Sequence, residues 1–443
     1  MLKVSKNVVK SILSSSIGNV LEWYEYTLYA YFAPVISGLF FPTDNPYVSM
    51  ILTFATFAIG LAARPIGGII FGYIGDRYSR RKTLAITMLF MSIPTLCIGL
   101  LPTYKQIGIA APIILVTLRI LQGLALGGEF GSSCVYLYES VSQNKRGFFG
   151  CMALTGVGCG LVLSSCTIFI IESLASKESI YAFVWRVPFF ISVFGAMIGF
   201  YMRRSLLETE DFIIARNNSD LISNPFMEML RNHKTTLFTL FAIFITTQIA
   251  FYIVFIFGKT MMVEFLHYDE HTAGKFNLFA VISYTIATVF FGYLSNKYNK
   301  RYIIILGSLG ILLSIYSFIF SLKMGDQSSI LLLSLLMGAL IGMTEGTLNP
   351  LTAESFPTNI RATSVAFCWN FTSVAFGGSA PIIVMWLMKH FDNNVYIVAY
   401  YLMIACIITI LVTLTMARKM KIKNNSLFME NIYPSRKEFI INS

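Results

Sequence analysis

The chain has 443 residues, of which 56% are hydrophobic and only 12% are charged. A soluble protein of this length has about 25% charged residues, so these values exclude an ordinary soluble enzyme or binding domain. The formal net charge is +11, but Lys and Arg cluster in short segments between apolar runs, as in the cytoplasmic loops of membrane proteins. We therefore expect an integral membrane protein that contacts the lipid bilayer and does not bind nucleic acid.

Twelve apolar runs of about 20 residues are each long enough to cross a bilayer as a helix. The predicted spans are 12–36, 49–74, 83–101, 111–138, 148–171, 184–202, 236–258, 273–294, 302–321, 329–353, 362–388 and 395–417. The predicted domains are an N-terminal six-helix half (1–202), a cytoplasmic central loop (203–235), a C-terminal six-helix half (236–417) and a cytoplasmic tail (418–443). The tail lacks a sustained heptad pattern, so we expect no coiled coil in it.

A short basic loop follows the second span, and a weaker copy follows the eighth. The first copy runs from Gly72 to Lys82, and the second runs from Gly292 to Arg301 with Asn296 in place of an acid. Basic residues are concentrated on the side that holds both loops and both termini, which predicts that this side is cytoplasmic. The repeat indicates two similar halves, with the function between them.

The first span carries the densest set of polar residues inside an apolar run. Glu22, Glu25, Tyr26 and Tyr29 have the spacing i, i+3, i+4 and i+7, so they share one face of a helix. Ionisable residues inside spans are costly, which makes them functional candidates. Two nearby carboxylates resist double ionisation, so one could load and release a proton near neutral pH. Alternatively, both pair with basic residues for folding.

The fourth span contains Arg119 and Gln122, followed by Glu129. An Arg inside a span needs a counter-charge, and Glu22 or Glu25 could supply it through the bundle interior. Competition between the proton and Arg119 for one carboxylate would then link protonation to helix movement. The alternative is a static Arg119–Glu129 pair.

The second half offers polar candidates for a substrate site. Glu345 and Asn349 share a face of the tenth span, next to Pro350. Further polar or aromatic contacts are expected from Gln248, Tyr252, Tyr284, Trp369 and Asn370. A zwitterion with a cationic amine would suit aromatic faces by cation–π attraction. For each of these residues taken singly, ordinary helix packing is the competing interpretation. Glu354 is expected to pair with Arg361 as a cytoplasmic latch.

Several strings, in this order along the chain, resemble the metabolite:proton symporter family of the major facilitator superfamily. They are GNVLEWYEYTLY, RPIGGIIFGYIGDRYSRRK, RILQGLALGGEFG, WRVPFF, ETEDF and ESFPTNIRA…FGGSAP. The resemblance covers nearly the whole chain. It implies an all-α integral membrane protein with twelve transmembrane helices in two six-helix pseudo-repeat halves, which transports a substrate bound between them.

The resemblance also implies roles for individual residues. The acidic pair of the first span corresponds to Glu22 and Glu25, and the Arg of the fourth span corresponds to Arg119. The loop acid corresponds to Asp76, a gating charge that pairs with the end of the eleventh span in the outward-open state. The rest of the expected gate consists of Gly72, Gly75, Arg77 and Arg81. Asn296 in the second copy implies a weaker latch there.

We therefore expect a symporter in the inner membrane of a bacterium, with a monomeric functional unit and no cofactor or metal. It should import a small polar metabolite with protons, with a proline- or betaine-type zwitterion as the leading substrate. A dicarboxylate or other organic acid is the alternative if Arg64 or Arg119 is free to bind it. A receptor of transporter fold that binds without transport is the second alternative. An enzyme is disfavoured because no nucleophile–His constellation occurs.

Overall fold

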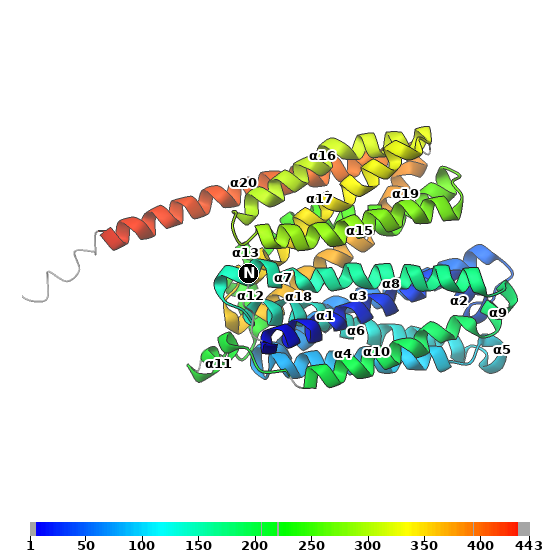
Figure 1. Ribbon diagram of the computed structural model, residues 1–443, viewed down its shortest axis with the longest axis horizontal. Coiled ribbons are helices and arrows are strands. Elements are labelled where there is room, and N and C mark those ends of the chain that lie inside the picture. Colours follow the sequence, from blue (N-terminus) through cyan, green and yellow to red (C-terminus); the bar gives the residue numbers. More distant parts are fainter. Residues whose placement is uncertain (1–5, 205, 219–220, 393, 433–443) are drawn as a thin grey trace, which may run out of the picture.

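The computed structural model describes residues 6–204, 206–218, 221–392 and 394–432, and this part of the chain is helical without strands. Its long helices lie roughly parallel in one bundle (Figure 1). Eleven of its helical segments are long and apolar enough to cross a membrane. The first helix, α1 (Lys6–Tyr31), lies among them and supplies a twelfth.

The first half consists of α1 and the helices that follow it up to Arg204. Its long elements after α1 are α3 (Pro46–Arg77), α4 (Arg80–Leu100), α6 (Ala110–Glu139), α8 (Met152–Leu174) and α10 (Val187–Arg204). The short elements between them are α2 (Ala33–Phe40), α5 (Tyr104–Ile107), η1 (Gln143–Lys145), α7 (Arg146–Gly150), α9 (Lys177–Ala182) and η2 (Val184–Arg186). The first predicted span is thus divided at Phe32, since α1 ends at Tyr31 and α2 begins at Ala33 with Pro34 in its first turn.

The segment between the halves holds two short helices, α11 (Glu210–Asn217) and α12 (Pro225–Asn232). Sequence analysis predicted a loop over 203–235. α12 is capped by the Asn224 side chain, which accepts a hydrogen bond from the Met227 backbone N–H. Both helices lie at the end of the bundle where α1 begins (Figure 1).

The second half contains the remaining long helices. They are α13 (Lys234–Phe251), α15 (Glu270–Leu294), α16 (Lys300–Met324), α17 (Gln327–Glu354), α18 (Arg361–Thr372), α19 (Ala380–His390) and α20 (Ile397–Ile432). Spans seven and eleven contain π-helical turns, namely η3 (Tyr252–Phe257) and η4 (Met261–Phe265) around α14 (Gly258–Thr260), and η6 (Ser373–Gly378). A short 3₁₀ turn, η5 (Thr358–Ile360), precedes α18. α20 continues past the predicted end of its span and extends out of the bundle (Figure 1).

The two halves repeat one packing scheme. In the first half α3 packs against α6, α1 against α8, and α4 against α10. The corresponding pairs in the second half are α15 with α17, α13 with α18, and α16 with α20. Between the halves, α18 packs against α3 and α6, and α15 packs against α8. A glycine allows the first of these approaches, because a Cβ atom on Gly72 would lie 2.6 Å from the Thr363 Cα atom.

Candidate functional site

The loop between α3 and α4 is locked to the second half at one end of the bundle. We call this end of the bundle the basic end, because it holds Arg77, Arg80, Arg81 and Lys82. The buried carboxylate of Asp76 accepts hydrogen bonds from the backbone N–H groups of Ala362 (2.9 Å) and Thr363 (2.7 Å). These groups begin α18, so Asp76 caps the positive end of a helix across the interface. The resemblance predicted this contact with the eleventh span.

The cation beside Asp76 differs from the prediction. Arg80 forms an ion pair with Asp76, and Arg81 instead donates to the Leu206 carbonyl oxygen (3.1 Å). Arg80 is fully buried, whereas Arg77 is partly exposed. Asp76 lies in the last turn of α3 and Arg80 begins α4, so the short turn at Tyr78 and Ser79 brings the two side chains together. The predicted supporting role of Arg77 and Arg81 at Asp76 is therefore wrong.

Further charges extend this lock. Arg80 also pairs with Glu139 (3.2 Å) and donates to the Thr358 carbonyl oxygen (2.7 Å). Glu139, at the end of α6, accepts a hydrogen bond from Arg361 (2.7 Å), which begins α18. Asp211 on α11 binds Arg146 through both carboxylate oxygens (2.9 and 2.7 Å) and reaches Arg361 at 3.4 Å. Ion pairs thus join both halves and the central segment at the basic end.

The second loop copy makes the equivalent contact with a neutral group. Asn296 Oδ1 accepts a hydrogen bond from the Gly147 backbone N–H (2.7 Å), where α7 leads into the fifth span. Glu354 pairs with Lys300 (2.8 Å) within the second half, so the predicted Glu354–Arg361 latch is wrong. Arg361 instead donates to the Ala353 carbonyl oxygen (2.9 Å). One lock is therefore charged and the other is not.

Glu25 and Arg119 do not touch, but a chain of hydrogen bonds connects them. Arg119 Nη1 donates to Gln122 Oε1 (2.9 Å), and Gln122 Nε2 donates to Thr95 Oγ1 (2.8 Å). The Thr95 hydroxyl lies 2.5 Å from Glu25 Oε2 and 2.9 Å from the Met91 carbonyl oxygen. A hydroxyl carries one proton, so Thr95 donates to one of these oxygens at a time.

The Arg119 guanidinium lies over three aromatic rings. Its central carbon is 4.2 Å from the ring centroid of Tyr29 and 5.4 Å from those of Tyr26 and Phe57. Arg119 Nε and Nη2 have no hydrogen-bond partner within the part of the chain that the structure describes. The static Arg119–Glu129 pair that sequence analysis left open is absent from that part. Glu129 instead forms an ion pair with Arg203 of α10.

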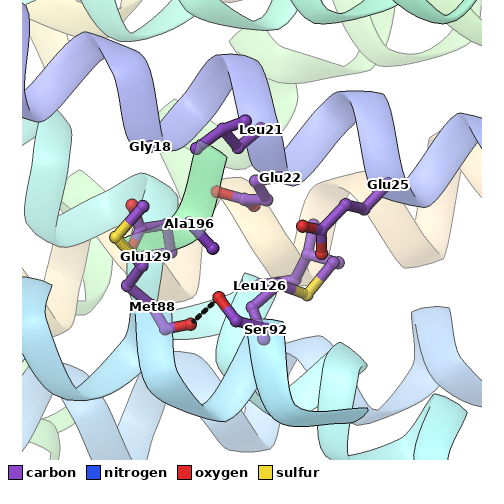
Figure 2. Close-up of a pocket in the computed structure, with 10 residues that line it drawn as sticks. Gly18, Leu21, Glu22, Glu25, Met88, Ser92, Leu126, Glu129 and Ala196 are labelled. Atoms are coloured by element: carbon purple, nitrogen blue, oxygen red, sulfur yellow. Dashed lines mark hydrogen bonds between the residues drawn. The ribbon is translucent and has the colours of Figure 1, made fainter. Parts of the chain in front are cut away.

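Glu22 lies in a small cavity of the first half with room for about one water molecule. The cavity is also lined by Gly18, Glu25, Ser92 and Glu129 (Figure 2). Glu22 is 3% exposed, and neither of its carboxylate oxygens has a hydrogen-bond partner among the described residues. Glu22 and Glu25 therefore line one cavity, but only Glu25 is bonded to the Arg119 chain.

Arg64 lies at the contact between the halves, near the middle of α3. It is fully buried, and its Nε donates to Asn370 Oδ1 (3.1 Å) on α18. Its guanidinium carbon lies 5.7 Å from the Trp23 ring centroid. Neither Nη1 nor Nη2 has a hydrogen-bond partner in the described ranges. A buried guanidinium with free donors is suited to binding a carboxylate.

Aromatic contacts between the halves lie next to Arg64 and Asn370 in this region. Trp23 meets the edges of Tyr26 (5.7 Å between centroids) and of Phe251 (5.8 Å) in α13. Trp369, next to Asn370 in sequence, stacks on Phe130 of α6 at 4.2 Å. Several polar atoms in this layer are buried without a hydrogen-bond partner among the described residues, namely Trp23 Nε1, Tyr26 Oη, Gln248 Nε2 and Trp369 Nε1. We call Arg64 and these four side chains the central layer.

Two of the other candidates of the second half, Tyr284 and Tyr252, form hydrogen bonds within that half. Tyr284 donates a hydrogen bond from its hydroxyl to Glu345 (2.6 Å), and its ring contacts Phe251 (5.8 Å). The Tyr252 hydroxyl bonds that of Ser373 (3.1 Å), which links η3 to η6. Glu345 Oε1 and Asn349 Nδ2 are buried without partners within the described residues.

Several residues of this site were not predicted from the sequence. Arg64 was expected only as an alternative ligand contact, although a cation inside an apolar span is itself a signal. Trp23 is marked only by its place between Glu22 and Glu25. Nothing in the sequence indicated Thr95 as the link to Glu25, since a Thr in a span usually bonds its own helix backbone.

Comparisons with known proteins agree with this architecture. The family model of the Major Facilitator Superfamily matches residues 16–380. The chain is 33% identical to a glycine betaine/proline/ectoine/pipecolic acid transporter of Dickeya dadantii and 32% identical to a proline/betaine transporter of Escherichia coli K12. Each match covers 92% of this chain and 83% of the relative. The solved structure of the proton:xylose symporter XylE aligns with a TM-score of 0.75 at 17% identity, covering 93% of this chain and 95% of that chain. The chain belongs to the Major Facilitator Superfamily.

Proposed function

We propose that this protein is a proton-coupled symporter that imports a small zwitterion of the proline or betaine type. The observation that carries the proposal is the buried Arg64 guanidinium between the halves, with two nitrogens unpaired among the described residues and an aromatic ring beside it. The substrates named for the relatives from D. dadantii and E. coli support the choice of zwitterion.

The central layer suits both charges of such a substrate. The Arg64 Nη1 and Nη2 groups offer a fork for one carboxylate, and the N–H groups of Trp23 and Trp369 add donors from both halves. The faces of Trp23, Tyr26 and Trp369 suit a cationic nitrogen, including a quaternary ammonium group that has no N–H to donate. Trp23 and Trp369 each contact an aromatic ring of the opposite half, which supports placing these donors and faces between the halves.

Proton coupling is assigned to Glu25 and Arg119, with Glu22 beside them. When Glu25 is charged, the Thr95 hydroxyl donates to it. When Glu25 is protonated, it donates to Thr95, whose own proton turns to the Met91 carbonyl oxygen. Gln122 donates a hydrogen bond to Thr95 and accepts one from Arg119. Protonation of Glu25 therefore changes the hydrogen-bond chain that holds the Arg119 side chain in position. Arg119 lies on Tyr26, a residue of the central layer, which connects the proton site to the substrate site.

The basic end is proposed to face the cytoplasm, which places both termini inside a bacterial inner membrane. With this end locked by Asp76 and Glu139, the described conformation is closed to the cytoplasm. Import requires these contacts to break while others form at the opposite end. The functional units are the two halves, 1–202 and 236–417, joined by 203–235 and followed by the tail 418–443, within a monomer.

Replacing Asp76 should weaken the inner lock. Asp76→Asn removes the charge that caps α18 and pairs with Arg80, at a cost to the closed state of about 1–3 kcal/mol. Uptake should fall about tenfold, and a cysteine placed at Thr363 should react faster with a reagent added from the basic end. The matched variant Asn296→Asp adds a charge to the second loop copy and should slow the reaction of the cysteine at position 363. Equal reactivity of this cysteine in the wild-type, Asp76→Asn and Asn296→Asp backgrounds would contradict the gating assignment.

The proposal is tested with purified protein in liposomes. An inward proton gradient should concentrate labelled proline or betaine, and a proton ionophore should abolish the accumulation. A sodium gradient of equal size should not replace it. Binding without accumulation would show a receptor instead of a transporter.

An organic acid is the second candidate, because Arg119 also has two nitrogens without partners in the described residues. Two guanidinium groups, each with two nitrogens unpaired among the described residues, suit a dicarboxylate such as α-ketoglutarate. The buried Glu345 carboxylate in the neighbouring layer favours a cationic group instead. Competition of proline, betaine, α-ketoglutarate and citrate for uptake of one labelled substrate separates the two candidates.

A further inference from the structure

Glu22 differs from the other buried carboxylates of the first half. Glu25 bonds Thr95, Glu129 bonds Arg203 and Thr87, and Glu139 bonds Arg80 and Arg361. Both Glu22 oxygens face the small cavity without a hydrogen-bond partner in the described part of the chain (Figure 2). An uncompensated buried carboxylate charge is costly, so a carboxyl group in this setting is suited to binding a proton.

The charged groups that act on Glu22 come from four helices. They are Glu25 on α1, Arg64 on α3, Glu129 on α6 and Arg203 on α10. A fifth helix, α4, contributes the uncharged Met88, Met91 and Ser92 to the cavity. Glu22 therefore lies among two other carboxyl groups and two guanidinium groups.

The Glu129–Arg203 pair is built to keep its charge beside Glu22. Arg203 is fully buried, donates to both Glu129 oxygens, and also donates to the Leu84 carbonyl oxygen (2.7 Å). Its guanidinium passes over Gly18, where a Cβ atom would lie 1.6 Å from Nη2. Any larger side chain at position 18 would displace Arg203. The sequence thus leaves space for this cation next to the Glu22 cavity.

These groups form a series that leads from the middle of the first half to its basic end. Along α1, Glu22 lies about 4.5 Å nearer that end than Glu25. Along α4, Thr87, which bonds Glu129, lies about 12 Å nearer it than Thr95, which bonds Glu25. Arg203 is the next-to-last residue of α10, which ends at the basic end. The series lies inside the first half, whereas the central layer lies between the halves.

We propose that Glu22 is an inner proton-release site, tuned by the Glu129–Arg203 pair, through which the coupled proton leaves within the first half and apart from the substrate. The inference rests on the proposed proton symport. The Glu25 carboxyl gives its proton, through water in the cavity, to the Glu22 carboxylate. Glu22 then releases it to the solvent at the basic end. Glu129 and Arg203 remain an ion pair throughout and act as positioning residues.

The test compares the effects of internal and external pH on uptake into oriented proteoliposomes. Acid inside should inhibit uptake by keeping Glu22 protonated. Glu129→Gln removes a negative charge and leaves Arg203 facing Glu22, so Glu22 releases its proton more readily. The internal pH of half-inhibition should shift by about one unit to more acid values. The external pH dependence should stay unchanged.

Glu22→Gln provides the second variant, because an amide of the same shape replaces a group that has no hydrogen bonds to lose within the described residues. Proton-driven accumulation should fall at least about tenfold, while exchange of labelled for unlabelled substrate continues. The exposed variant Glu178→Gln, at the far end, is the control. Wild-type accumulation and internal pH response in Glu22→Gln would overturn the release site. If Glu25→Gln still abolishes accumulation in that case, the proposed symport stands. A wild-type protein without proton-driven accumulation would overturn both.

Discussion

Glu25→Gln is expected to abolish proton-driven accumulation and to leave substrate exchange intact. With one proton per substrate, a gradient of one pH unit supports about tenfold accumulation, and the variant should reach a ratio of about one. The amide cannot take up and release the proton, so the energy of the gradient no longer reaches the substrate. It can still bond the Thr95 hydroxyl, which keeps the chain to Gln122 and Arg119 in place. Exchange needs only the movement of the loaded carrier, so it should continue.

Accumulation is measured as uptake under a proton gradient, and exchange is measured as counterflow without a gradient, in the same proteoliposomes. Thr95→Val serves as a matched variant, because it removes the link to Gln122 and retains the Glu25 carboxyl. It should keep the accumulation ratio and change the pH dependence of uptake. Full accumulation by Glu25→Gln would remove Glu25 from the coupling mechanism.

Arg64→Gln should produce the largest loss of substrate binding. Removing one partner of a buried charged hydrogen-bonded pair costs about 2–5 kcal/mol, equivalent to an increase of about 30-fold to more than 1,000-fold in Kd. The reason is the loss of the only guanidinium in the central layer. Arg64→Lys keeps the charge but loses the planar fork, so it should recover part of the affinity.

The measurement is equilibrium binding of proline and of betaine, together with initial uptake rates. Asn370→Ala is the matched control, because it removes the hydrogen bond that orients the Arg64 Nε and leaves the guanidinium present. Its effect should be several times smaller. A loss of thermal stability in Arg64→Gln without a change in KM would assign Arg64 to structure instead of substrate. An unchanged affinity would indicate that Arg119, and not Arg64, binds the substrate carboxylate.

Much of the architecture follows from local sequence patterns. Long apolar runs must form helices in a bilayer because each backbone group must bond within its own segment, so span number and approximate ends were predictable. The capping contact of Asp76 with the eleventh span was also predictable, through the family resemblance. The spacing of Glu22 and Glu25 predicted that they share a helix face, because this depends only on the turn of one helix.

The partners of charged side chains on different helices depend on how the helices pack. Sequence analysis offered Glu22, Glu25 or Glu129 as the counter-charge of Arg119, yet Arg119 reaches Glu25 only through Gln122 and Thr95. Glu129 instead forms an ion pair with Arg203, which lies 74 residues further along the chain. Spacing fixes which side chains share a helix face, but the rotation and contact of neighbouring helices decide which charges meet. Local sequence patterns thus predicted the membrane spans, the two halves and the acidic pair, whereas the packing between helices set which cation each carboxylate binds.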